Sequence, residues 1–284
     1  YCTVKEKILI YRDLKRIDCE ISLLGWDGTP YRELRLALPV AAPGGKIAYE
    51  VPMGVVEVGT NELPGIGGHA YGELVYDEPC SQIRPREVQN FVSVNGAQFG
   101  LTMSTCVAVN DYQDPTTNPV SYPVIQPVLL ASRRSCHSEG NWYLQEGDHH
   151  YGFSLFSHSP GWKKGYRSGI QANHPLIPVV VSAPNREAHL FEEKSFFHFP
   201  IQVGDLHVLI STIKKCDDDG SVIVRCFDIG GENAGCNLNF LFPIERAEVV
   251  NIIEEEGRAI ESQKNSIHFK VGHHAIETLK LLPR

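Results

Sequence analysis

The sequence predicts an all-β protein, and three observations support this prediction. Apolar and polar residues alternate in many short segments, as expected of half-buried strands. Clusters of glycine, proline, asparagine and aspartate separate these segments at regular intervals, which is typical of β-sandwiches. Helical spacing stands out in one place, where Trp162, Tyr166 and Ile170 recur every four residues.

The first part of the chain is predicted to form strands at residues 7–11, 16–24, 31–39, 46–58, 88–94, 98–109, 128–132, 147–158 and 178–182. In residues 16–24, alternation places Ile17, Cys19, Ile21 and Leu23 on one face. Asn95-Gly96 is the strongest short hairpin signal and joins the strands around it. Residues 110–127 are rich in proline, asparagine and threonine, so we expect a long loop with a functional surface there.

The last hundred residues also predict short strands, at 206–215, 221–229, 237–242, 247–253, 266–271 and 276–282. Asp217-Asp218-Asp219-Gly220 marks a hairpin between the first two of them. Pro184-Asn185 lies in a polar segment and is the candidate boundary between two units. We therefore expect one domain at residues 1–185 and a smaller β-sandwich at residues 186–284.

Composition and charge limit the classes of partner. The net charge of -8 argues against nucleic acid and against an anionic membrane surface. No apolar run approaches the length of about 18 residues that a spanning helix needs. The eight cysteines form no Cys-x-x-Cys pair, so no structural zinc site is predicted, and free buried cysteines are favoured over a disulfide framework. Because the sequence begins at Tyr1, we expect it to be a piece of a longer polypeptide.

The most distinctive stretch is residues 147–176. It predicts a strand in which His149 and Phe153 face one way and His150 and His158 the other, then a break, then a short helix. The helix is expected to end at Asn173-His174-Pro175-Leu176, because proline restricts the residue before it.

Several segments together resemble the C-terminal β-sandwich region of glycoside hydrolase family 38, the α-mannosidases. The similar segments lie in the family's order at residues 16–39, 49–57, 88–112, 147–176 and 224–228. They include Arg16-Ile17-Asp18, the histidine strand with Asn173-His174-Pro175-Leu176, and Val224-Arg225-Cys226-Phe227-Asp228, where Asp228 stands for the family's glutamate.

The resemblance implies a galactose-mutarotase-like supersandwich followed by a smaller β domain. It also implies retaining hydrolysis of α-mannosides, in which one carboxylate is the nucleophile and a second carboxyl is the acid and base. The family's catalytic carboxylates and zinc lie in an N-terminal catalytic domain for which this chain has no match. The chain is therefore expected to hold no catalytic residue and no cofactor, to be inactive alone, and to have that catalytic domain and a mannose-containing glycan as partners.

Arg225, Trp142 and Tyr143 are the predicted substrate-binding residues. Arg225 shares a strand face with Ile223 and Phe227, so its guanidinium needs a partner. Either it pairs with an acidic residue of the sandwich, or it reaches the interface with the catalytic domain, or it is exposed at a sheet edge. Trp142 and Tyr143 lie in a polar segment and are candidate exposed aromatic contacts for a sugar.

Other residues favour structural roles. Trp26 and Trp162 are further aromatic candidates, with Trp162 better explained as the anchor of the helix. His150 and His158 share a face but are roughly 26 Å apart along an extended strand, at about 3.3 Å per residue. They cannot hold one metal ion, so hydrogen-bonded structural histidines are expected.

Two further functions stay open at this stage. One is a stand-alone mutarotase-like enzyme, which needs an acid and a base such as His149 and Glu73. The other is a carbohydrate-binding or structural module. Association with a second copy is left open, and the sequence indicates no compartment.

Overall fold

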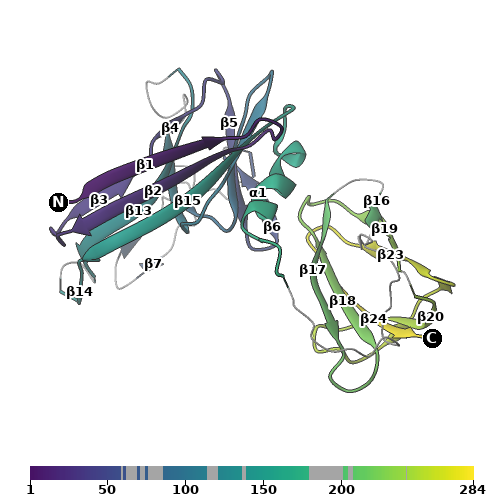
Figure 1. Cartoon of the computed structure of the whole chain (residues 1–284). Coiled ribbons are helices and arrows are strands. Elements are labelled where there is room, and N and C mark those ends of the chain that lie inside the picture. The colour runs from purple at the N-terminus through teal and green to yellow at the C-terminus, as the bar shows by residue number, and fades with distance from the viewer. Residues whose placement is uncertain are drawn as a thin grey trace. The chain divides into compact units, whose positions relative to one another are not determined.

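The computed structural model describes residues 1–58, 60–61, 69–70, 74–75, 86–113, 121–135, 139–178, 201–203, 207–240 and 242–284. The chain divides into two compact units, Tyr1–Pro175 and Leu176–Arg284 (Figure 1). Strands dominate both units, which confirms the predicted all-β class. The predicted boundary at residue 185 lies outside the described residues and stays a prediction.

The first sheet of the first unit is antiparallel and contains seven described strands. In spatial order they are β1 (Thr3–Ile10), β2 (Ile17–Trp26), β15 (Gly147–His158), β11 (Gly100–Ser104), β10 (Phe91–Asn95), β5 (Lys46–Val51) and β6 (Gly54–Glu57). β15 therefore lies between β2 and β11, and Figure 1 shows it beside β1 and β2. The Asn95-Gly96 hairpin is confirmed, since Asn95 pairs with Gly100.

The second sheet is built around one long strand, β13 (Val124–Arg134). On β13 pair β14 (Trp142–Tyr143), β12 (Val109–Gln113), β3 (Arg32–Arg35) and β4 (Leu38–Pro39), and β12 also pairs with β9 (Arg86–Glu87). A separate short pair is formed by β7 (His69–Ala70) and β8 (Leu74–Val75). The apolar faces of the two large sheets share one core, to which Leu23, Val94 and Phe153 contribute from the first sheet and Ile125 and Leu130 from the second.

Several predicted segments differ from the structure, and three of them are described here. The strand expected at 46–58 is two strands, because Met53 takes a left-handed φ of 61° in the turn between them. The strand expected at 98–109 stops at Ser104, and a turn leads to β12. The long loop expected at 110–127 is wrong at the two ends of that range, which β12 and β13 occupy.

β1 extends the first sheet beyond its covered area. Val4 and Ile8 are opposite Leu23 and Cys19 of β2, so they point to the core side of the sheet. Their partners are buried, yet Val4 is 62% exposed, Ile8 57% and Ile10 77%. These three residues, called the β1 row below, share that face with Glu6 and carry apolar surface from the core face into solvent.

A short helix covers the other face of the first sheet. The turn η3 (Trp162–Lys164) leads into α1 (Tyr166–Ala172), which contacts β10, β11 and β15. Gly169 permits the close approach, since a Cβ there would lie 2.6 Å from Cβ of Phe91. The helix ends at Asn173 as expected, and the Asn173 side chain donates hydrogen bonds to the backbone oxygens of Asn90 (3.1 Å) and Thr105 (2.9 Å).

The second unit is a smaller β-sandwich. One described sheet has the spatial order β16 (Ile201–Val203), β19 (Ala234–Asn239), β23 (Ser266–Val271) and β22 (Ser262–Gln263). The other has the order β17 (Val208–Lys215), β18 (Val222–Asp228), β24 (Ile276–Pro283), β20 (Ile244–Val250) and β21 (Arg258–Ala259). β17 and β18 form the predicted hairpin. Between the sheets lies a second core that includes Val224 and Cys226 of β18 and Leu238 of β19.

The cysteines and the helices add two findings. Six cysteines of the described part of the chain are free, and four of them are buried: Cys19, Cys216, Cys226 and Cys236. Neither helical segment in that part has the length and apolar character needed to cross a bilayer.

Candidate functional site

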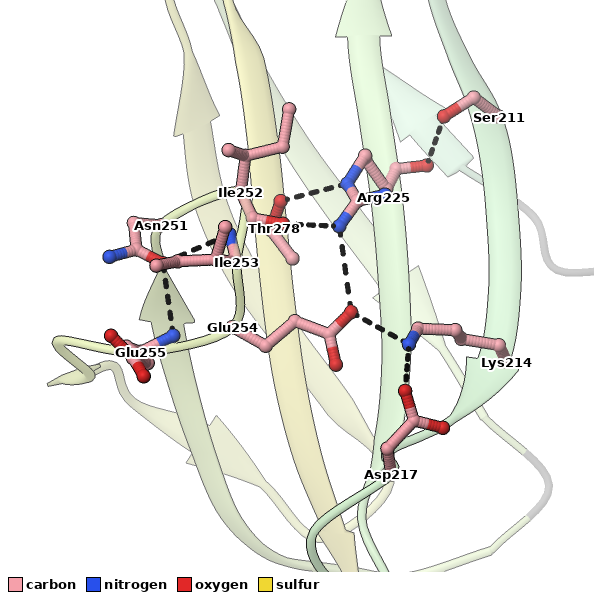
Figure 2. Close-up of polar contacts among 10 residues, drawn as sticks. All are labelled: Ser211, Lys214, Asp217, Arg225, Asn251, Ile252, Ile253, Glu254, Glu255 and Thr278. Carbon is pink, nitrogen blue, oxygen red and sulfur yellow. Dashed lines mark hydrogen bonds and ion pairs between the residues drawn. The ribbon is translucent and has the colours of Figure 1, made fainter.

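Arg225 lies on the face of β18 that points away from the core, and its side chain is 21% exposed. Its Nε donates to Thr278 Oγ1 at 3.1 Å, and its Nη2 donates to the backbone oxygen of Ile252 at 2.9 Å. The same Nη2 lies 3.6 Å from Glu254 Oε1 (Figure 2). The salt bridge to an acidic residue of the sandwich, one of the three alternatives above, is therefore observed.

Two of the three partners of the Arg225 side chain, Ile252 and Glu254, belong to the loop at residues 251–257, which we call the isoleucine loop. Lys214 also pairs with Glu254, at 2.9 Å, so two cations hold one carboxylate (Figure 2). The Asn251 side-chain oxygen accepts hydrogen bonds from the backbone N–H groups of Ile253 and Glu255. These contacts fix a loop whose Ile252 and Ile253 side chains remain 61% and 68% exposed.

Asp228, at the end of the same strand, is fully buried. Its carboxylate accepts four backbone hydrogen bonds, from Gly230 (3.0 Å), Gly231 (2.7 Å), Glu232 (2.9 Å) and His274 (3.0 Å). Such a carboxylate organises backbone rather than substrate. Within residues 224–228, Arg225 thus binds the loop at residues 251–257, and Asp228 binds the turn that follows β18 and the backbone of His274.

Trp142 is half-exposed and takes part in a cluster at one end of the first unit. The Arg134 guanidinium lies over the Trp142 ring at 5.4 Å, and Tyr31 meets the same ring edge-on at 5.7 Å. Arg134 also donates to the backbone oxygen of Gly140 at 2.8 Å. The cluster therefore holds the short strand β14 against β13.

Tyr143 faces the opposite way from Trp142, because successive strand residues alternate. It pairs with Arg133 and, with that residue, lines a groove on the outer face of the second sheet. The groove has a volume of about 920 Å³, and Glu33 and Gln145 also line it. Trp142 is not among the lining residues, so the structure does not bring the two predicted aromatic contacts into one groove.

The two remaining tryptophans have structural positions. Trp26 is 2% exposed and its Nε1 donates to the backbone oxygen of Leu144 at 2.8 Å, so the suggestion that it stacks on a sugar is wrong. Trp162 is half-buried and lies edge-on to Tyr166 at 5.9 Å, consistent with the anchoring role expected of it.

The histidines of β15 are hydrogen-bonded, as expected. His149 bonds the backbone oxygen of Gln145 (2.6 Å) and His150 bonds Ser22 Oγ (2.9 Å). His158 bonds Thr102 Oγ1 (2.9 Å) and the backbone oxygen of Ser159 (2.7 Å), and burial lowers its pKa.

No group of three or more potential metal ligands occurs among the residues that the structure describes. The mutarotase-like alternative needed Glu73 beside His149, and Glu73 lies outside those residues.

Sequence reasoning missed Glu254, Glu33 and Gln145. Glu254 was not singled out from the sequence, although it is the acidic partner of Arg225. The sequence contains one signal for it, because Arg225 in an apolar row requires an acidic partner. No pattern within the sequence indicates which of the acidic residues fills that position.

Taken together, these features define a class: a protein portion made of two β-sandwich units, in whose described residues no group of three or more potential metal ligands occurs. Residues 207–279 match the model of the Glycosyl hydrolases family 38 C-terminal beta sandwich domain. The resemblance to the C-terminal β-sandwich region of family 38 is thereby confirmed.

Two solved structures share the fold over 98% of this chain. One is an alpha-mannosidase from Enterococcus faecalis V583, with 13% identity and a TM-score of 0.63. The other is a protein in the Glycosyl Hydrolase Family 38 from Enterococcus faecalis, with 15% identity and a TM-score of 0.66. The chain spans 29% and 30% of their lengths. No curated protein matches it in sequence.

Proposed function

We propose that this chain is the C-terminal β-sandwich portion of a family 38 α-mannosidase. The observation that carries the proposal is the match of residues 207–279 to the family's C-terminal domain, and the shared fold supports it. In this proposal the full-length protein hydrolyses α-mannosides with retention, using two carboxyl groups and a zinc ion of its catalytic domain. This chain supports that domain and supplies neither the catalytic carboxyl groups nor the ligands of the zinc ion.

Two exposed apolar surfaces support a role as a structural support. They are the β1 row in the first unit and Ile252 and Ile253 of the isoleucine loop in the second. We assign both to contact with the catalytic domain of the same polypeptide, because the matched family domain is a C-terminal one and the chain spans less than a third of the similar structures. Arg225 then acts as a positioning residue, since it holds the loop that makes the contact.

The activity test compares this chain with its full-length parent. Hydrolysis of an aryl α-mannoside is measured for both, with zinc added and with a chelator. Activity in the parent alone, lost with the chelator, is the expected result. Hydrolysis by this chain alone would contradict the proposal and place the catalytic groups within its own 284 residues.

The contact test uses the parent carrying Ile252→Lys and Ile253→Lys together. Full burial of each isoleucine contributes about 1.5–3 kcal/mol, so the double variant should lose activity on heating well before the parent does. Ile213→Lys is the matched control, because Ile213 is also exposed (47%) but lies outside the isoleucine loop. Equal heat resistance of the parent and the double variant would refute the assigned contact.

A second candidate function is carbohydrate binding without catalysis. One observation favours it, the groove beside Tyr143. An exposed aromatic ring next to polar side chains is an arrangement that can hold a sugar. This function is compatible with the first.

A further inference from the structure

The groove beside Tyr143 lies along β13, and part of its lining shares one face of the second sheet. Directly paired residues of antiparallel strands point the same way. Ala131 pairs with Glu33 and Arg133 pairs with Tyr143, so these four side chains line up across β3, β13 and β14. The volume of about 920 Å³ lies within the range of about 300–1,000 Å³ found for small-ligand sites.

Tyr143 is presented to this groove rather than packed away. Its side chain is 53% exposed, and within the described part of the chain it makes no hydrogen bond or ring contact. On the opposite face, Trp142 is clamped between Arg134 and Tyr31, which keeps β14 in place. The clamp therefore fixes the backbone of β14, and so the position from which the Tyr143 side chain projects, before any ligand arrives.

The polar groups of the groove surround that ring. The Arg133 side chain lies beside Tyr143 and is exposed. This side chain has no hydrogen bond or ion pair with another described residue. Gln145 is anchored, since its Oε1 accepts from the backbone N–H of Ala131 at 3.3 Å, and its Nε2 keeps two donor hydrogens. The floor includes Val109 and Leu129. An aromatic plate, an apolar floor and amide and guanidinium donors suit a ligand with both C–H faces and hydroxyl groups.

We propose that this groove is a non-catalytic carbohydrate-binding site, in which a pyranose ring stacks on Tyr143 and Arg133 and Gln145 bond its hydroxyl groups. Its preference for α-linked mannose rests on the function proposed above. The site would hold a glycan chain near the enzyme while another part of the glycan is hydrolysed.

The test is calorimetric titration of α-linked mannopentaose into the 284-residue chain, with cellopentaose in parallel. Loss of one aromatic contact of about 0.5–1.5 kcal/mol predicts that Tyr143→Ala weakens binding of mannopentaose by up to about tenfold. Tyr143→Phe should retain binding, because it keeps the ring. Tyr122→Ala is the matched control, since Tyr122 is another partly exposed tyrosine (38%) that does not line the groove, and it should bind as the unaltered chain does.

Three results would overturn the proposal in different ways. If mannopentaose fails to bind at millimolar concentration, or if Tyr143→Ala binds it as well as the unaltered chain, the groove is not a carbohydrate site. If cellopentaose binds equally, the preference for α-linked mannose is refuted. Hydrolysis of a small aryl α-mannoside by the parent does not depend on binding in the groove. Failure of the groove proposal and failure of the proposed function are therefore separate outcomes.

Discussion

Replacement of Asp228 provides the sharpest test of how the second unit is held together. The Asp228 carboxylate is fully buried and accepts four backbone N–H groups, three from the turn that follows β18 and one from His274. The turn and the residue before β24 are distant in sequence. One side chain thus joins two loops, and its removal should loosen both.

The magnitude follows from the number of hydrogen bonds. A hydrogen bond to a charged group contributes about 1.5–3 kcal/mol, and a buried donor left without a partner costs about 1–3 kcal/mol. Such effects are not additive within one cluster. Asp228→Ala should therefore lower the free energy of unfolding of this unit by about 4 kcal/mol or more. Asp228→Asn keeps one acceptor oxygen but turns an amide donor toward an N–H group, and should cost about 2 kcal/mol.

The assay must report on the second unit alone. Residues 176–284 contain neither tryptophan nor tyrosine, so intrinsic fluorescence follows the first unit. Cys226 and Cys236 are fully buried, and burial raises the pKa of their thiols to about 12 and about 11. Pulsed thiol labelling across a urea series, read by mass spectrometry, therefore detects opening of this unit.

Asp218→Asn is the control, because Asp218 is an exposed hairpin residue and should leave the urea midpoint unchanged. The reasoning is refuted if Asp228→Asn shifts the midpoint no more than this control does. It is also refuted if Cys226 and Cys236 of the Asp228→Ala variant become labelled only at the urea concentration at which they become labelled in the unaltered chain.

Three predictions concern the first unit, each measured by urea unfolding followed by tryptophan fluorescence. Gly165→Ala should cost about 1–3 kcal/mol, since its Cβ would lie 2.3 Å from the ring of His158, whereas Gly152→Ala, with open space around it, should be tolerated; equal midpoints would contradict this. Because the pKa of His158 is lowered from 6.5, stability should fall as the pH drops below about 6.5, and His158→Gln should reduce that dependence. Asn173→Ala removes hydrogen bonds to two backbone oxygens and should cost about 2 kcal/mol; no shift of the midpoint would show that the helix end is held by other contacts.

Local patterns of the sequence were sufficient for the strands and hairpins. The alternation in residues 16–24 predicts the buried face of β2, and Cys19, Ile21 and Leu23 are indeed buried. Ser266–Val271 was predicted with the bounds that the structure has. These predictions succeed because strand periodicity and turn residues act over a few neighbouring positions.

The candidate site was predictable only in part, because its contacts join distant segments. Arg225 needed an acidic partner, but its pairing with Glu254 depends on β24, which pairs with both β18 and β20 and so brings the isoleucine loop that follows β20 close to Arg225. Trp142 and Tyr143 are adjacent in sequence and were treated as one contact. Because they lie in a strand, they point to opposite faces, and the register of β14 on β13, which the sequence alone does not define, decides which face each takes.

The position of β15 bears on how the chain is made. In the first sheet, β1 and β2 form one piece and β11, β10, β5 and β6 another, and β15 joins the two. During synthesis on the ribosome, residues 1–146 emerge before the strand that unites them. Until residue 158 is available, β2 and β11 lack the strand that pairs with both of them, and such late, long-range pairing is slow. We therefore expect a nascent chain truncated before Gly147 to bind chaperones rather than to fold as a smaller stable domain.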